Sequence, residues 1–94
     1  MNTQCNKMIN IILNNPQKKF WYAKDFQRGE WFIGYEASAR MSDLLRIYPE
    51  ILMPIKDGRY RAIRVNWENE KEIQELKEYF KTISEINDKE NINE

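Results

Sequence analysis

The chain has 94 residues, enough for one small domain, and its 15 Lys and Arg are balanced by 15 Asp and Glu. It has no histidine and one cysteine, Cys5, which excludes a Ser-His-Asp triad, an imidazole metal site and an internal disulfide. Three scattered glycines are too few for a phosphate-cradling loop, and no apolar run approaches the ~18 residues of a membrane span. We therefore expect a soluble cytoplasmic protein that is not an enzyme and that carries no cofactor or metal.

The zero net charge is the sum of two opposite halves. Residues 1–67 hold 11 basic and 6 acidic side chains, whereas residues 68–94 hold 4 basic and 9 acidic side chains, so the halves carry +5 and −5. Such asymmetry is typical of a nucleic-acid-binding unit joined to an acidic appendage, but a basic domain followed by a solvated helix has the same charges. We predict one domain at residues 1–67, followed by an acidic helix and a frayed tail at residues 68–94.

Helical periodicity predicts a first helix over residues 3–14, ended by Asn14-Asn15-Pro16. Residues 20–28 are ambiguous, because Phe20-Trp21-Tyr22 favours extended chain and the following residues favour about two turns of helix before Gly29. The clearest helix covers residues 35–48 and is ended by a proline. Its narrow core stripe consists of Ala37, Met41, Leu44, Leu45 and Tyr48.

Residues 51–55 and 59–66 are predicted to be strands joined by Asp57-Gly58, a pair suited to the positive φ angles of a two-residue hairpin turn. Pro54 indicates that the first strand lies at a sheet edge. Residues 68–86 are predicted to form an acidic helix whose apolar residues follow a 3-4-3 spacing. This stripe is either a dimer seam or a face folded back on the domain. Its residues are Ile73, Leu76, Phe80 and Ile83.

A short helix, a tight turn, a further helix and a basic hairpin follow one another in the order of a winged helix-turn-helix, an α+β fold. Residues 34–44 (GYEASARMSDL) resemble the recognition-helix pattern of winged helix-turn-helix proteins of bacteriophages and mobile elements, and residues 58–61 (GRYR) are similar to their hairpins. The resemblance covers roughly residues 5–66 and leaves out the acidic helix. It implies three helices, a two-stranded wing and DNA binding, usually in regulation.

The resemblance implies that the first half of the recognition helix faces the major groove. A major groove does admit one α-helix, and an arginine such as Arg40 can bond a guanine there. Cations of the hairpin would contact phosphates or the minor groove. Alternatively, Arg40 and Arg46 are solvated charges paired with neighbouring carboxylates. The predicted DNA-binding residues are Ser38, Ala39, Arg40, Asp43, Arg46, Lys56, Arg59, Arg61 and Arg64.

Two functional hypotheses follow. In the first, the protein is a regulator of transcription or replication that binds double-stranded DNA, as a homodimer joined through its acidic helix. In the second, it is a protein-interaction module, such as a phage inhibitor of a host nucleic-acid enzyme, whose acidic helix imitates a phosphate backbone. One continuous basic surface of Arg40, Arg59, Arg61 and Arg64 would favour DNA binding, whereas scattered arginines would favour the interaction module.

Overall fold

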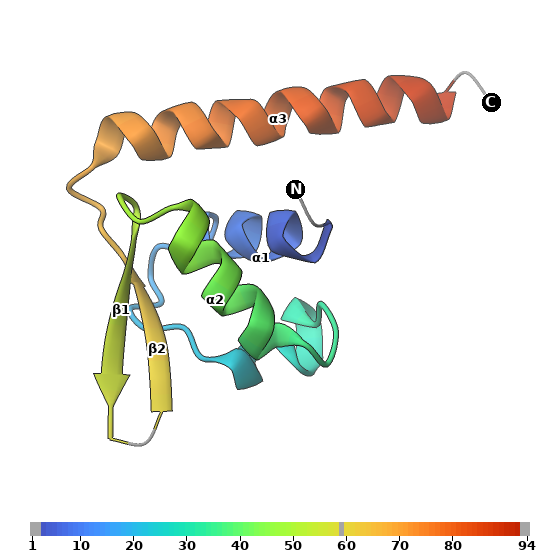
Figure 1. Cartoon of the computed structure of the whole chain (residues 1–94). Helices are drawn as coiled ribbons and strands as arrows, with labels where there is room; N and C mark the ends of the chain where they lie inside the picture. Colours follow the sequence, from blue (N-terminus) through green and yellow to red (C-terminus); the bar gives the residue numbers. More distant parts are fainter. Residues whose placement is uncertain (1–2, 59, 93–94) are drawn as a thin grey trace.

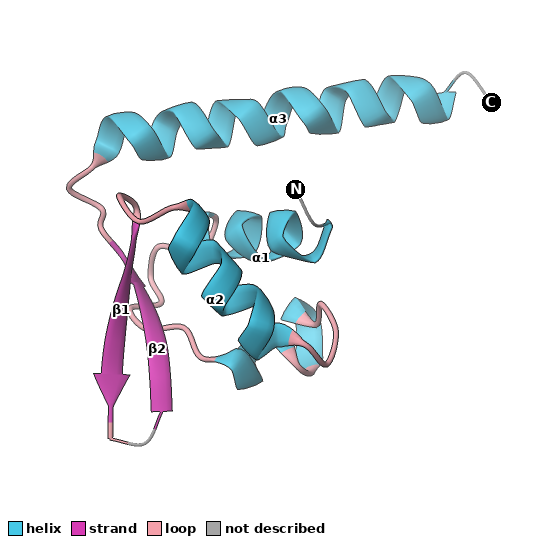
Figure 2. Cartoon of the chain, viewed as in Figure 1, coloured by secondary structure: helices cyan, strands magenta, loops and turns pink. Residues whose placement is uncertain are grey.

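The computed structural model describes the backbone of residues 3–58 and 60–92, with side chains for all of these except Asp57, Tyr60 and residues 84–92 (Figure 1). The described chain is α+β, with three α-helices and one antiparallel hairpin (Figure 2). The elements are α1 (Thr3–Leu13), the 3-10 turns η1 (Ala23–Phe26) and η2 (Gly29–Trp31), α2 (Ala37–Ile47), β1 (Leu52–Asp57), β2 (Tyr60–Val65) and α3 (Glu70–Ile92).

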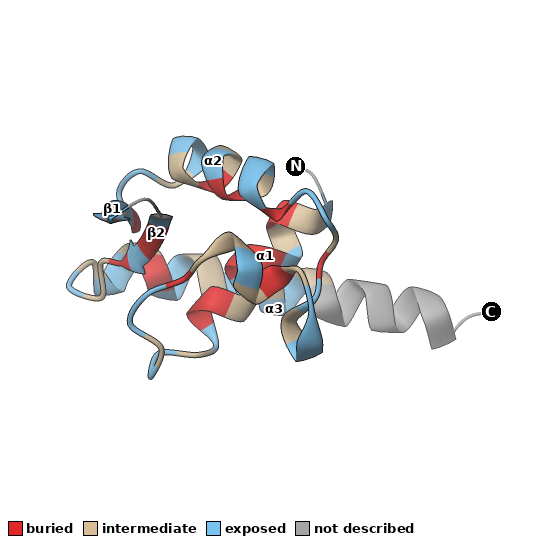
Figure 3. Cartoon of the chain, turned by 90° about the horizontal axis from the view of Figure 1, so that it is seen from below, coloured by how far each residue is buried: buried red, intermediate tan, exposed pale blue. Residues whose placement is uncertain are grey.

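The core forms around α1, which buries one complete face. The α1 residues at helical spacing pack in one core with the buried stripe of α2 and with residues of the hairpin. Figure 3 shows the buried segments of these elements in red. The aromatic rings of Trp21 and Phe26 close this core, with ring centroids 5.4 Å apart. The buried α1 residues are Cys5, Met8, Ile9, Ile12 and Leu13.

The predicted second helix was wrong, because the chain forms two separate 3-10 turns there. Tyr22 N–H donates to the Asp25 side chain at 2.8 Å, while Asp25 N–H donates to the Tyr22 carbonyl at 3.0 Å. These local bonds close one tight turn. Gly29, at φ +81°, then takes a left-handed conformation that stops helical continuation.

The hairpin is extended by one residue of a third segment. Trp21 and Ile63 exchange two backbone hydrogen bonds, of 2.9 and 2.8 Å, so Trp21 pairs with the outer side of β2. This confirms the extended chain predicted before the second helical segment. Pairing on only one side leaves β1 at the edge, where Pro54 needs no ladder donor. The turn at Gly58 has φ +59°.

Helix α3 runs across the end of the molecule opposite the hairpin tip (Figure 1). Ile73 is buried in the core, and Leu76 and Phe80 pack partly against it. The second half projects beyond the domain, so the radius of gyration is 13.9 Å, against about 12.4 Å for a compact chain of this length. The helix continues to Ile92, beyond the end predicted at residue 86. Within residues 3–58 and 60–92, no helix combines the length and apolar character needed to cross a bilayer.

Candidate nucleic-acid interface

The outward face of α2 is small and weakly polar. Ser38, Ala39 and Ser42 are exposed, while Ala37 and Leu44 are buried against the core. The Ser42 hydroxyl donates to the Ser38 carbonyl at 3.3 Å, which keeps its side chain close to the helix. This face therefore allows close approach by another surface.

Arg40 does not lie on that outward face. Only 19% of its side chain is exposed, its Nε lies 3.1 Å from Asp43 Oδ2, and Nη1 lies 4.0 Å from Glu36 Oε2. The Nε group is buried and not aligned for a hydrogen bond, so its contact with Asp43 is an ion pair. The alternative interpretation of Arg40, as a helix charge paired with nearby carboxylates, describes its position in the structure.

The flank of α2 that carries Arg40 and Asp43 faces α1. Burial raises the pKa of the Cys5 thiol on α1, and the Asp43 carboxylate raises it further, whereas Arg40 acts in the opposite direction. Arg46 is 77% exposed, but its Nη2 donates to Asp43 Oδ1 at 3.0 Å. One carboxylate thus holds two of the predicted DNA-binding arginines.

Lys56 and Arg61 form a pair of like charges across the hairpin. They are direct cross-strand partners, which places their Cβ atoms about 5 Å apart on one face. Both are exposed, and neither forms an ion pair with an acidic side chain that the structure describes. Like charges directly opposite each other destabilise a hairpin, so the pair is costly unless an anion lies against it.

A groove of about 820 Å³ separates α2 from the hairpin. Its floor is apolar and includes Met41, Leu45 and Ile63, while Lys56 and Arg61 lie along its hairpin side. Lys24 of η1 also lines the groove, and its ammonium lies 5.3 Å from the Tyr22 ring centroid. The groove therefore combines an apolar floor with a cationic rim, beside the exposed serines of α2.

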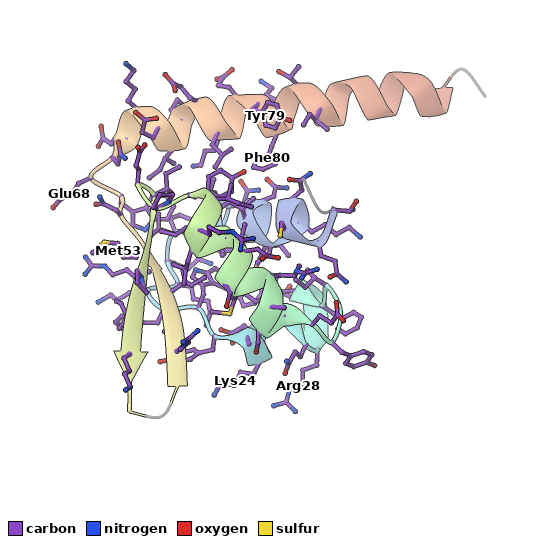
Figure 4. The ribbon with its side chains drawn as sticks, in the orientation of Figure 1. Lys24, Arg28, Met53, Glu68, Tyr79 and Phe80 are labelled. Carbon is purple, nitrogen blue, oxygen red and sulfur yellow. The ribbon has the colours of Figure 1, made fainter. Side chains whose placement is uncertain are left out.

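The three arginines of the predicted basic surface that the structure describes do not lie on one face. Arg40 is mostly buried beside α1, and Arg61 lines the groove. Arg64 is exposed opposite Met53, whose side chain points away from α2 in Figure 4. Arg59 lies outside the described residues. A different basic set gathers instead, because Lys24, Lys56 and Arg61 line one groove.

Two exposed aromatic side chains were missed from the sequence. Tyr35 is 84% exposed immediately before α2, and Phe32 is 48% exposed. Their rings meet edge to face, with centroids 5.4 Å apart. When the helical period of α2 is extended back by two residues, Tyr35 falls on the side opposite the core stripe. The exposure of Tyr35 could therefore have been predicted from the periodicity.

The apolar stripe of α3 is used partly inside its own chain. Ile73 is only 5% exposed, so in this conformation it is not open to a second copy. Leu76, Phe80 and Ile83 are half-buried, and Tyr79 is 56% exposed on the neighbouring flank. Of the two alternatives, the structure therefore shows the folded-back face for Ile73, and the later residues keep surface available for association.

The acidic helix lies away from the cationic groove. In Figure 4 the labelled Lys24 and Arg28 lie at the lower end of the molecule, whereas α3 lies at the upper end. The carboxylates described on the first half of α3 therefore do not cover the groove within this chain. No protein-family model, curated protein or solved structure matches the chain.

Proposed function

We propose that the chain is a winged helix-turn-helix protein that binds double-stranded DNA, with α2 in the major groove and the hairpin as its wing. The order of α1, a bridging extended residue, two tight turns, α2 and an antiparallel hairpin supports this fold. The outward face of α2 is free of bulky side chains at Ser38 and Ala39, which supports close approach to base edges. As the phage-type resemblance implies, its role is to regulate transcription or replication.

The paired cations of the hairpin carry this proposal. Lys56 and Arg61 lie opposite each other, without a described acidic partner, on the rim of a groove beside α2. A sugar–phosphate strand has the matching chemistry, because its phosphates relieve the like-charge repulsion and its deoxyribose packs on an apolar floor. The acidic α3 at the opposite end supports DNA binding by leaving this groove uncovered.

The salt dependence of duplex binding tests the proposal. Replacing Lys56 and Arg61 together by serine removes two phosphate contacts, so the slope of log K against log salt becomes less negative by about 1.8. Binding weakens on every duplex sequence, because phosphate contacts carry no sequence information. Lys71→Ser, which removes one exposed cation from α3, leaves the slope unchanged and serves as control. An equal slope in wild type and the double variant would contradict the proposal.

A protein-interaction module is the second candidate, and the dispersed arginines favour it. Arg40 and Arg64 do not share one face of the molecule. Helix α3, in addition, exposes the carboxylates of Glu70, Glu75 and Glu78. If these carboxylates imitate phosphates, changing all three to glutamine abolishes binding to a nucleic-acid enzyme. The same change leaves duplex binding intact if the groove binds DNA, so this variant separates the two candidates.

A further inference from the structure

The half of α2 nearest the hairpin tip lacks the side chains that usually read guanine and adenine. Bidentate bonds to these bases need Arg or Lys for guanine and Asn or Gln for adenine. Among residues 35–42, the only such side chain is Arg40, which is mostly buried and paired with Asp43. Glu36 is the exposed carboxylate of this segment, and its Oε2 lies on the same flank, 4.0 Å from Arg40.

Apart from the Glu36 carboxylate, the exposed surface of this segment consists of apolar groups and hydroxyls. The Tyr35 ring stands almost free of the protein and is held edge to face by Phe32. One turn on, the Ala39 methyl group is also exposed. The hydroxyl groups of Ser38 and Ser42 can accept or donate a hydrogen bond, so they do not discriminate between bases. Glu36 lies on the Arg40 flank, so the discriminating chemistry of the outward face itself is contact with apolar groups.

The major groove offers one apolar group in unmodified DNA, the C5-methyl group of thymine. We propose that Tyr35 and Ala39 contact thymine methyl groups, with Phe32 positioning the Tyr35 ring, so that the preferred ligand is A·T-rich duplex DNA. This inference rests on the proposed function, because it requires that α2 enters the major groove. The cations of the hairpin rim supply affinity for any duplex, while the methyl contacts supply the preference.

Replacement of thymine by deoxyuridine tests the inference, because it removes only the C5-methyl group. We compare an A·T-rich duplex, the same duplex with deoxyuridine at every thymine, and a G·C duplex with cytosine or 5-methylcytosine. Wild-type affinity falls by about four-fold for each contacted methyl group that is removed, as expected for one buried carbon. It rises by a similar factor when methyl groups are added to cytosine, which carries its C5-methyl at the same groove edge.

Three variants locate the effect. Tyr35→Ala and Ala39→Ser each reduce the ratio of thymine-duplex to deoxyuridine-duplex affinity, and both positions are exposed, so the fold is retained. Tyr79→Ala, at an exposed tyrosine of α3, keeps the wild-type ratio and is the matched control. The inference is overturned if wild type binds both duplexes equally, or if the Tyr35 and Ala39 variants keep the full ratio. Equal binding to both duplexes leaves the proposed function standing, whereas absence of binding to any duplex overturns both.

Discussion

Asp43 accepts a hydrogen bond from Arg46 across one turn of α2, at 3.0 Å between Oδ1 and Nη2. The same carboxylate lies 3.1 Å from the Nε of Arg40 through its other oxygen. A negative charge thus lies beside the face that we propose to enter the major groove, and it neutralises cations that would otherwise attract phosphates. We therefore expect α2 to add less non-specific electrostatic attraction to DNA than its two arginines would indicate.

Asp43→Asn is expected to strengthen binding to duplex DNA of any sequence. Loss of the carboxylate releases the exposed guanidinium of Arg46 to contact a phosphate, so the salt slope becomes more negative by about 0.9. Fluorescence anisotropy titrations at several salt concentrations measure both changes. Glu75→Gln is the control, because it removes one exposed carboxylate from α3, away from the proposed interface. Unchanged affinity in the Asp43 variant would show that Arg46 lies outside the interface.

Ile73→Ala is expected to destabilise the whole domain by about 2–5 kcal/mol, because it leaves a cavity where α3 joins the core. Ile83→Ala, at a half-buried position further along the helix, costs below about 1 kcal/mol. Urea unfolding monitored by tryptophan fluorescence gives both values. Equal small effects would mean that the boundary predicted at residue 67 separates two independent units, and α3 would then not be part of the domain's fold.

We predict that association of two copies uses the projecting half of α3. Ile73 is buried in the core of its own chain, but Ile83, ten residues further along α3, is only half-buried. An Ile83→Asp substitution therefore lowers the dimer fraction measured by light scattering, while the circular dichroism spectrum of the folded domain is kept. Thr82→Asp introduces the same charge change at an exposed neighbouring position and serves as control. A wild-type mass of one copy at all concentrations would refute the dimer.

Gly34→Ala is expected to lower the melting temperature more than Gly58→Ala. Gly34 has φ +141°, and a Cβ there would lie 2.6 Å from Nε2 of Gln4, so that amide must leave its 3.1 Å hydrogen bond to the Ile33 carbonyl. Strain and the lost bond together cost more than about 1 kcal/mol. Gly58, at φ +59°, has open space around the added methyl and loses about 1 kcal/mol. Thermal unfolding of both variants makes the comparison, and a larger loss at Gly58 would contradict it.

The elements with strong hydrophobic periodicity were predictable from the sequence. Helix α2 shows why the exposure of the site residues was harder to predict. Ala37 and Leu44 define the buried stripe of α2 from their spacing alone. Arg40 lies at the edge of that stripe, and its exposure depends on which flank packs against α1. The periodicity of one helix does not show which of its flanks packs against a neighbouring helix. The sequence alone therefore could not tell whether Arg40 contacts bases or lies mostly buried as the partner of Asp43.

The second helical segment and α3 show two other effects that the sequence pattern does not reveal. A side-chain bond between Asp25 and the Tyr22 amide, together with a left-handed Gly29, replaced the expected helix by tight turns. Local hydrogen bonds of this kind compete with helix propensity and are not visible in composition. In α3, propagation from a packed first half carried the helix to Ile92, because extending a helix is far easier than starting one. Asp57-Gly58, by contrast, requires a turn locally, and the hairpin formed where it was predicted.

The placement of α3 at the end of the molecule opposite the hairpin has a kinetic consequence. A chain with no net charge but with its +5 and −5 halves held apart behaves as an electric dipole. Close to a polyanion such a dipole turns its cationic end inward before contact, so that a larger share of encounters begins in the productive orientation. The torque weakens beyond the Debye length of about 8 Å at physiological ionic strength. The orientation of the proposed complex is therefore selected in the last few ångströms of approach. At longer range a chain without net charge is neither attracted to DNA nor repelled by it.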